Sequence, residues 1–198
     1  MRLRSLFSRA PADASLTQRA IWLIVAKTLA FASSFLLPVV LVRQMSVADF
    51  GVYKQASLIL GTVLNVFPLG FAMSAFYFLP RETNRQGAVV FNILIVYLLV
   101  GMLSCLLFAL SPGLLLTIFK SGDIAEYSSL IGVTTLFAVA SSFLEYVVLA
   151  EGDVRLAAVL VLAIQVLRVM LLIGAAAFYG SVTALLNAVL LHGVIQLA

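Results

Sequence analysis

The sequence predicts an all-α membrane protein, a polytopic bundle of six transmembrane helices. Three observations support this fold class. The 198 residues are 64% hydrophobic, only 10% are charged, and the mean hydropathy is +1.18. A soluble domain has about half apolar and about a quarter charged residues. This chain has too few charges to cover a water-facing surface, so a soluble enzyme is excluded, and its hydrophobicity also excludes disorder.

Five continuous apolar runs are each long enough to cross the hydrocarbon core, which takes about 20 residues in a helix. These runs are 20–42, 56–79, 88–110, 129–150 and 156–179. A sixth run, 182–198, is still apolar where the sequence ends, so we expect a sixth span that is cut short. Membrane β-strands would alternate in polarity over about ten residues, so the continuous runs favour helices.

The chain divides into a basic lead, residues 1–19, and a six-helix transmembrane lobe, residues 20–198. The lead carries four arginines and is expected to be cytoplasmic, as a short interfacial helix or a frayed tail. With the N-terminus inside, seven arginine and lysine residues fall on the cytoplasmic side and three on the outer side. Because cytoplasmic loops are enriched in lysine and arginine, this bias predicts a cytoplasmic N-terminus.

The connections predict how the helices are joined. Residues 151–153 and 180–181 form short links, so the fourth, fifth and sixth runs are expected to be antiparallel neighbours. The connection 111–128 is not plainly polar, because it carries the apolar string LLLTIF. We expect this string to lie at the outer membrane surface or to extend the third run.

Two local patterns predict a helix start and a bend. Ser46 with Asp49 three residues later has the character of a capping box and predicts a helix that begins near Val47. In the second run, Pro68 lacks a backbone donor and Gly70 tolerates unusual backbone angles, so together they predict a hinge. A passive kink is the alternative interpretation of this pair.

No catalytic or cofactor motif is present, and the chain has no phosphate-binding P-loop. One cysteine, Cys105, and one histidine, His192, exclude a disulfide framework and a zinc cluster. The basic residues are scattered rather than gathered in a stripe, which excludes a nucleic-acid partner. We therefore expect no enzyme activity, no cofactor and no metal.

The charged residues inside the apolar runs are the candidate site residues, because a charge within a bilayer is costly and usually faces the bundle interior. Lys27 and Glu145 lie at similar depth and can pair, which makes Glu145 an ion-pair or coupling candidate. Arg168 lies near the midplane with no acid at its depth, and Gln165 shares its helix face. Arg168, Lys27 and Gln165 are thus candidates for a cationic substrate cavity, with snorkelling to the interface as the alternative for Lys27 and Glu145.

Several strings resemble one family, and their order and spacing run from about residue 16 to the end. Residues 43–53 read RQMSVADFGVY and resemble the first outer loop of the polysaccharide and O-antigen flippases, which commonly carry an arginine, a turn, an acid and Phe-Gly-x-Tyr. Residues 69–70, LG, with 78–82, FLPRE, resemble the second span of that family and its exit. Residues 150–155, AEGDVR, are similar to the turn between the fourth and fifth spans.

The resemblance implies the amino-terminal lobe of a two-lobe transporter of the multidrug, oligosaccharidyl-lipid and polysaccharide exporter superfamily, with the second lobe missing. It implies flippase-type transport of a lipid-diphosphate-linked oligosaccharide across the bacterial inner (plasma) membrane for polysaccharide and lipopolysaccharide biosynthesis. The implied partners are an undecaprenyl-diphosphate-linked glycan, membrane lipid and other polysaccharide-assembly membrane proteins. The cationic cavity typical of the family suits a diphosphate, and Lys27 and Arg168 are the residues that can fill that role.

Two other functions remain open at this point. A drug/cation antiporter of the same superfamily would need an acidic cavity. Here the deepest charge is Arg168 and the intramembrane acid Glu145 is shallow, which favours an anionic substrate. A non-transporting six-span membrane subunit is the other alternative, and it would bind no lipid diphosphate.

Overall fold

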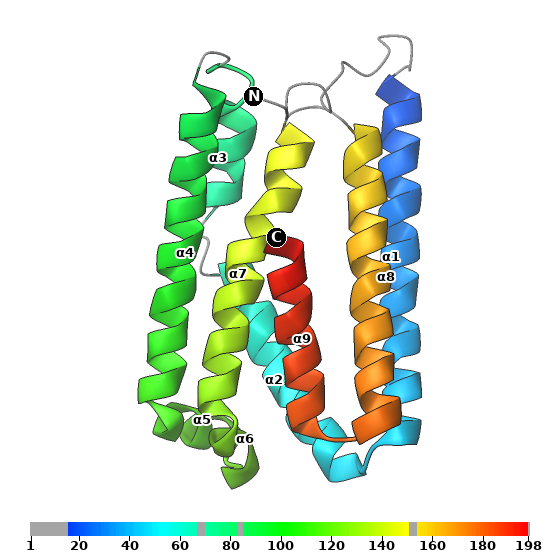
Figure 1. Ribbon diagram of the computed structural model, residues 1–198, viewed down its shortest axis with the longest axis vertical. Helices are drawn as coiled ribbons and strands as arrows, with labels where there is room; N and C mark the ends of the chain where they lie inside the picture. The colour runs from blue at the N-terminus through cyan, green and yellow to red at the C-terminus, as the bar shows by residue number, and fades with distance from the viewer. Residues whose placement is uncertain (1–15, 67–69, 83–84, 151–153, 198) are drawn as a thin grey trace.

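The computed structural model describes residues 16–66, 70–82, 85–150 and 154–197, and these ranges form nine helices and no strand (Figure 1). The helices are α1 Leu16–Gln44, α2 Val47–Val66, α3 Phe71–Phe78, α4 Gln86–Leu110, α5 Pro112–Phe119, α6 Gly122–Glu126, α7 Ser128–Ala150, α8 Val154–Tyr179 and α9 Val182–Leu197. The predicted all-helical fold is confirmed, and α1 begins within the segment that the sequence assigned to a separate basic lead.

Four of the helices, α1, α4, α7 and α8, are long and apolar enough to cross a membrane. The prediction of six such spans is not confirmed. With 16 residues, α9 is about 24 Å long, which is shorter than the hydrocarbon core of about 30 Å. The second predicted run is divided between α2 and α3, because Gly70 has a φ of 79° and this left-handed conformation is incompatible with a continuing helix.

The start of α2 follows the predicted capping pattern. The backbone N–H of Asp49 donates to Ser46 Oγ at 3.0 Å, and the Ser46 hydroxyl donates to Asp49 Oδ2 at 2.6 Å. The helix therefore begins at Val47, nine residues before the apolar run that the sequence identified. Capping by a serine satisfies an otherwise unpaired donor at the helix start, which explains the early beginning.

The long helices run back and forth between two ends of the bundle (Figure 1). The start of α1, the start of α4, the end of α7 and the start of α8 lie at one end, and the turn between α8 and α9 lies at the other end together with α5 and α6. Ser111 and Pro112 end α4, so the connection folds as two short separate helices across the end of the bundle rather than extending α4. At the α8–α9 turn, Gly180 has a φ of 56°.

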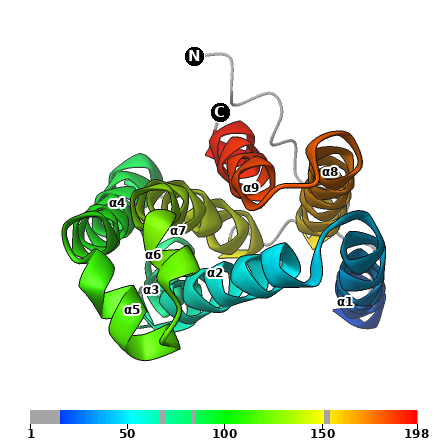
Figure 2. The ribbon, with the colours of Figure 1, turned by 90° about the horizontal axis from the view of Figure 1, so that it is seen from below.

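Seen from the end, the bundle has two sides (Figure 2). α1 and α8 lie on one side, α4 and α7 on the other, and α2 and α9 lie between them. One buried cluster includes Tyr97, Ile131 and Leu186, and a second joins Leu41 to Leu172. The fold thus pairs α1 with α8 and α4 with α7, and leaves α7 and α8 facing each other across the middle.

The outer surface of the long helices is strongly apolar. The exposed fraction is 62% for Phe35, 61% for Leu99 and 63% for Val159. A monomeric soluble protein rarely exposes such continuous apolar surface. This surface and the four long apolar helices are the properties expected of a protein embedded in lipid.

Candidate functional site

A polar cavity of about 230 Å³ lies within the bundle between α2, α7, α8 and α9. Residues three or four positions apart on each helix line it, because such residues share one helix face. The polar lining consists of Ser141, Ser142 and Glu145 from α7, Gln165 and Arg168 from α8, and His192 and Gln196 from α9. Apolar residues complete the wall, among them Leu60 and Leu64 of α2.

Arg168 is the charged donor of this polar cavity. Its side chain is half-buried, and within the described part of the chain no hydrogen bond or ion pair reaches its guanidinium group. An arginine carries five N–H donors and stays charged under all ordinary conditions. The polar cavity therefore contains a cationic donor group whose hydrogen-bonding capacity is unused by the described residues.

Lys27 and Glu145 form the ion pair that their similar depth suggested. Lys27 Nζ lies 3.2 Å from Glu145 Oε1, and the two side chains are 53% and 37% exposed. Only Glu145 lines the polar cavity, so Lys27 is held at its edge rather than beside Arg168. The pair connects α1 to α7 and neutralises the carboxylate, which leaves Arg168 to set the net charge of the cavity.

Gln165 lines the same cavity as Arg168, as their spacing on one helix face suggested. Its amide nitrogen is engaged elsewhere, since Nε2 donates to Ser33 Oγ at 3.1 Å, and that hydroxyl donates to the carbonyl of Ala30 at 2.7 Å. This chain of hydrogen bonds fixes α8 to α1. The Gln165 side chain therefore contributes an amide oxygen to the cavity more readily than a donor.

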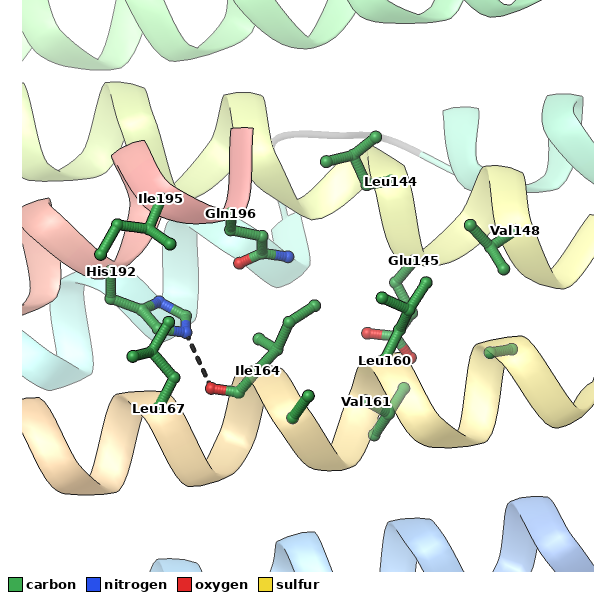
Figure 3. Close-up of a pocket in the computed structure, with 12 residues that line it drawn as sticks. Leu144, Glu145, Val148, Leu160, Val161, Ile164, Leu167, His192, Ile195 and Gln196 are labelled. Carbon is green, nitrogen blue, oxygen red and sulfur yellow. Dashed lines mark hydrogen bonds between the residues drawn. The ribbon is translucent and has the colours of Figure 1, made fainter. Parts of the chain in front are cut away.

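His192 and Gln196 are site residues that the sequence reasoning missed or treated as packing. His192 is buried, and its Nε2 lies 3.1 Å from the carbonyl oxygen of Ile164 (Figure 3). Gln196 Nε2 donates to the carbonyl oxygen of Ser141 at 3.3 Å. These contacts tie α9 to both α8 and α7, and the spacing of four residues between them was the signal that could have placed both on one face.

The serines of α7 are further lining residues that the sequence reasoning missed. Ser141 Oγ donates to the carbonyl of Ala138 at 3.1 Å, and Ser142 Oγ donates to that of Val139 at 2.8 Å. Such bonds to the preceding turn are usual for serine in an apolar helix. Because the hydroxyl hydrogens are used in this way, the two oxygens remain as acceptors at the cavity wall.

A second, apolar cavity of about 280 Å³ adjoins the first between α7, α8 and α9 (Figure 3). We call it the apolar chamber, and its own lining is Leu144, Val148, Ala157, Leu160, Ala163, Leu167 and Ile195. It shares with the polar cavity five lining residues, Glu145, Val161, Ile164, His192 and Gln196. Figure 3 shows Glu145 of α7 and His192 of α9 directed toward α8.

Gly70 of the predicted hinge lines neither cavity. Gly70 is exposed and has a left-handed backbone conformation between α2 and α3, whereas Pro68 lies outside the described residues. The helix is interrupted where the two residues predicted a bend. A role in motion stays a prediction, although α2 supplies Leu60 and Leu64 to the cavity wall only a few residues before the interruption.

The described residues contain no group of histidine, cysteine, aspartate and glutamate side chains that could hold a metal ion. No family model matches the chain, and no curated protein or solved structure matches it significantly. Function is therefore inferred from the apolar helices, the two cavities and the sequence resemblance.

Proposed function

We propose that the chain is the amino-terminal membrane lobe of a flippase-type transporter, which moves a lipid-diphosphate-linked oligosaccharide across the bacterial inner membrane for polysaccharide biosynthesis. The sequence resemblance suggests this activity, and one structural observation carries the proposal. Arg168, on a helix long enough to cross a membrane, lines a polar cavity with its guanidinium unpaired among the described residues. A charge in that position is costly unless a ligand or partner compensates it.

A diphosphate is the ligand that suits Arg168 best. The planar guanidinium fork meets two phosphate oxygens at once, and hydrogen bonds between charged groups are about twice as strong as neutral ones. Since Glu145 is neutralised by Lys27, no unpaired carboxylate of the described residues opposes an anion in the polar cavity. The same pairing argues against a drug/cation antiporter, which would need Glu145 free to bind a cation.

The rest of the polar lining suits hydroxyl groups. Ser141 and Ser142 direct their hydrogens to their own helix, and Gln165 and Gln196 donate to other groups of the protein. The oxygens of these four side chains are acceptors, which sugar hydroxyls can satisfy as donors. A cation surrounded by acceptors is complementary to an anionic group attached to a sugar. In a two-lobe transporter, alternating access then requires this lobe to move relative to the second lobe.

The test is to replace Arg168 in the complete transporter, in cells whose surface-polysaccharide export depends on it. We expect Arg168→Gln to lower export at least tenfold at normal membrane abundance, and Arg168→Lys to retain part of it, because lysine keeps the charge without the fork. Arg85→Gln, at the exposed residue before α4, is the matched control and should export normally.

Export and membrane abundance are measured together, because they separate the possible roles of Arg168. Full export by a normally abundant Arg168→Gln variant would remove this residue from the mechanism. Loss of the folded protein in the same variant, rescued by neutralising an acidic residue elsewhere in the complete transporter, would assign Arg168 to a structural ion pair. Normal export without the gene would favour a non-transporting subunit.

A further inference from the structure

The short helix α3, Phe71–Phe78, is about 12 Å long, whereas one leaflet contributes about 15 Å to the hydrocarbon core. It therefore extends through most of one leaflet only. α3 packs against α4 and α7, with Ala75 on its buried side. Seen from the end of the bundle, α7 lies between α3 and α9 (Figure 2). The outer side of α3 is thus open on the far side of α7 from α9.

This open side changes from apolar to cationic along the helix. Met73, Tyr77 and Arg81 follow one another at intervals of four residues and so share one face, and Phe76 lies beside them. The exposed fraction is 67% for Met73, 39% for Phe76 and 54% for Tyr77, and Arg81 is exposed as well. We call these four residues the α3 stripe.

The guanidinium group of Arg81 has a defined position in the stripe. Its central carbon lies 3.8 Å from the centre of the Tyr77 ring, and its Nη1 donates to the Tyr77 carbonyl at 3.2 Å. The Tyr77 ring in turn packs edge-to-face on Phe78, with 5.0 Å between the ring centres. A group that is already positioned loses less conformational entropy when it binds a ligand.

Most of the hydrogen-bonding capacity of Arg81 is unused. A guanidinium has five N–H donors, and the Tyr77 carbonyl accepts one hydrogen bond from it. Among the described residues no carboxylate forms an ion pair with Arg81, including the adjacent Glu82. The stripe therefore ends in a cation whose remaining donors are available to an anion.

The cationic end of the stripe lies at the boundary of the membrane. Gln86, the first residue of α4, donates from Nε2 to the Leu79 carbonyl at 3.4 Å, which holds the turn after α3 at the start of α4. With 25 residues, α4 is about 38 Å long and exceeds the hydrocarbon core of about 30 Å, so its ends reach the headgroups. Arg81 is thus level with lipid phosphates, and Met73 is level with acyl chains.

We propose that the α3 stripe binds an anionic phospholipid, with Arg81 on the headgroup phosphate and Met73, Phe76 and Tyr77 beside the acyl chains. The order of the stripe matches the order of groups in one lipid molecule. α3 lies at the same end of the bundle as the start of α1 (Figure 1), so the lipid belongs to the leaflet that the sequence predicts to be cytoplasmic. The site requires only that the chain lies in a membrane, and it is independent of the proposed flippase activity.

The headgroup, and not the acyl chain, gives the site its selectivity. Lipid tails are as apolar as the side chains of the stripe, so contact with Met73 and Phe76 aligns a lipid without favouring one lipid over another. Arg81 favours a lipid with net negative charge, because the ammonium group of phosphatidylcholine compensates its phosphate internally. The site should therefore select phosphatidylglycerol over phosphatidylcholine.

The experiment uses brominated lipids, which quench a tryptophan that they contact. The chain has one tryptophan, Trp22, so a Trp22→Phe background makes room for one new reporter. Phe76→Trp places the reporter in the stripe, and Phe91→Trp places the control on α4 at a position that is 60% exposed. Both full-length variants are measured in nanodiscs with a small, equal fraction of brominated phosphatidylglycerol or brominated phosphatidylcholine.

We expect phosphatidylglycerol to quench the Phe76→Trp reporter at least twofold more than phosphatidylcholine, and the two lipids to quench the Phe91→Trp reporter equally. Equal quenching by the two lipids at Phe76→Trp, or the same preference at both reporters, would overturn the site. A millimolar excess of soluble glycerol phosphate should leave the preference unchanged. Loss of the preference in its presence would assign Arg81 to a soluble phosphate instead.

Two pairs of variants in the Phe76→Trp reporter test the role of Arg81. Arg81→Gln should abolish the preference, whereas Arg85→Gln, which removes an exposed arginine four residues further along, should retain it. Equal losses in these two variants would indicate diffuse attraction to basic residues and overturn the site. Tyr77→Leu should reduce the preference because it removes the ring beneath Arg81, and Tyr77→Phe should preserve it. Equal preferences in the two Tyr77 variants would contradict the role of the ring in positioning Arg81.

Discussion

α7 meets α4 on one side and faces α8 on the other, and the two interfaces are built from different residues. Toward α4, a Cβ placed on Gly132 would lie 2.8 Å from the carbonyl oxygen of Cys105, and one on Gly101 would lie 3.0 Å from that of Leu136. Toward α8, the side chains are larger or polar, and two cavities separate the helices. The same helix thus has one face for close packing and one face that borders two cavities.

The difference shows how close helix packing on one side of α7 can stabilise the bundle while cavities remain on its other side. Two apolar helices gain little from the hydrophobic effect inside lipid, so close backbone contact at small residues supplies the attraction. At the α4–α7 interface, Gly101, Ser104 and Gly132 allow this contact. Between α7 and α8 the backbones are not in such close contact, and polar side chains such as Ser142 and Arg168 line a cavity there instead.

The largest expected effect is at the close interface. Gly132→Ala should destabilise the protein by about 1–3 kcal/mol, because its methyl group would overlap the backbone of Cys105. Gly61→Ala is the matched control, since a Cβ there meets nothing within 4 Å and alanine favours a helix by up to about 1 kcal/mol. Thermal unfolding in detergent measures both variants. Equal melting temperatures would contradict the assignment of α4–α7 as the stabilising interface.

A smaller effect is expected at the ion pair between Lys27 of α1 and Glu145 of α7. Lys27→Glu places two carboxylates together and adds negative charge at the edge of the polar cavity, so export should fall about tenfold. The exchange Lys27→Glu with Glu145→Lys restores opposite charges and should recover export to within about threefold of wild type. Little change in stability is expected, because both side chains are exposed enough for solvent to screen the pair.

The exchange also tests whether the pair is specific. If Lys27→Glu, Glu145→Lys and the double exchange all export equally poorly at normal membrane abundance, transport depends on the residue at each position and not on their pairing. Normal export by Lys27→Glu alone would show that the link between α1 and α7 has no part in transport.

Much of the fold could be predicted from the sequence. α4, α7 and α8 begin and end within two residues of the apolar runs, because a continuous run of this length has few other structures available to it in lipid. The second run is one apolar stretch in the sequence, but it forms two helices, at the place where Pro68 and Gly70 predicted a bend. Hydropathy does not distinguish one long helix from two that are separated by a left-handed glycine, which here is Gly70.

The site was only partly predictable. The similar depth of Lys27 and Glu145 along their helices correctly predicted their ion pair. The helical spacing of Gln165 and Arg168 correctly predicted that they line the same cavity. Ser141, Ser142 and Gln196 were missed. In helices that are apolar on every face, the sequence does not reveal how each helix is rotated about its axis, so packing decides which polar residues face inward.

The comparison between the two sides of α7 is tested most directly by cysteine protection in the Cys105→Ala background. Ser142→Cys introduces a thiol in the polar cavity, and Ser104→Cys introduces one that is buried at the α4–α7 interface. A membrane-permeant maleimide should alkylate the first and leave the second unmodified. Inorganic diphosphate, which is the headgroup alone, should slow alkylation of Ser142→Cys at least fivefold, and Arg168→Gln should abolish this protection. Equal alkylation at the two positions, or protection that persists without Arg168, would contradict the account.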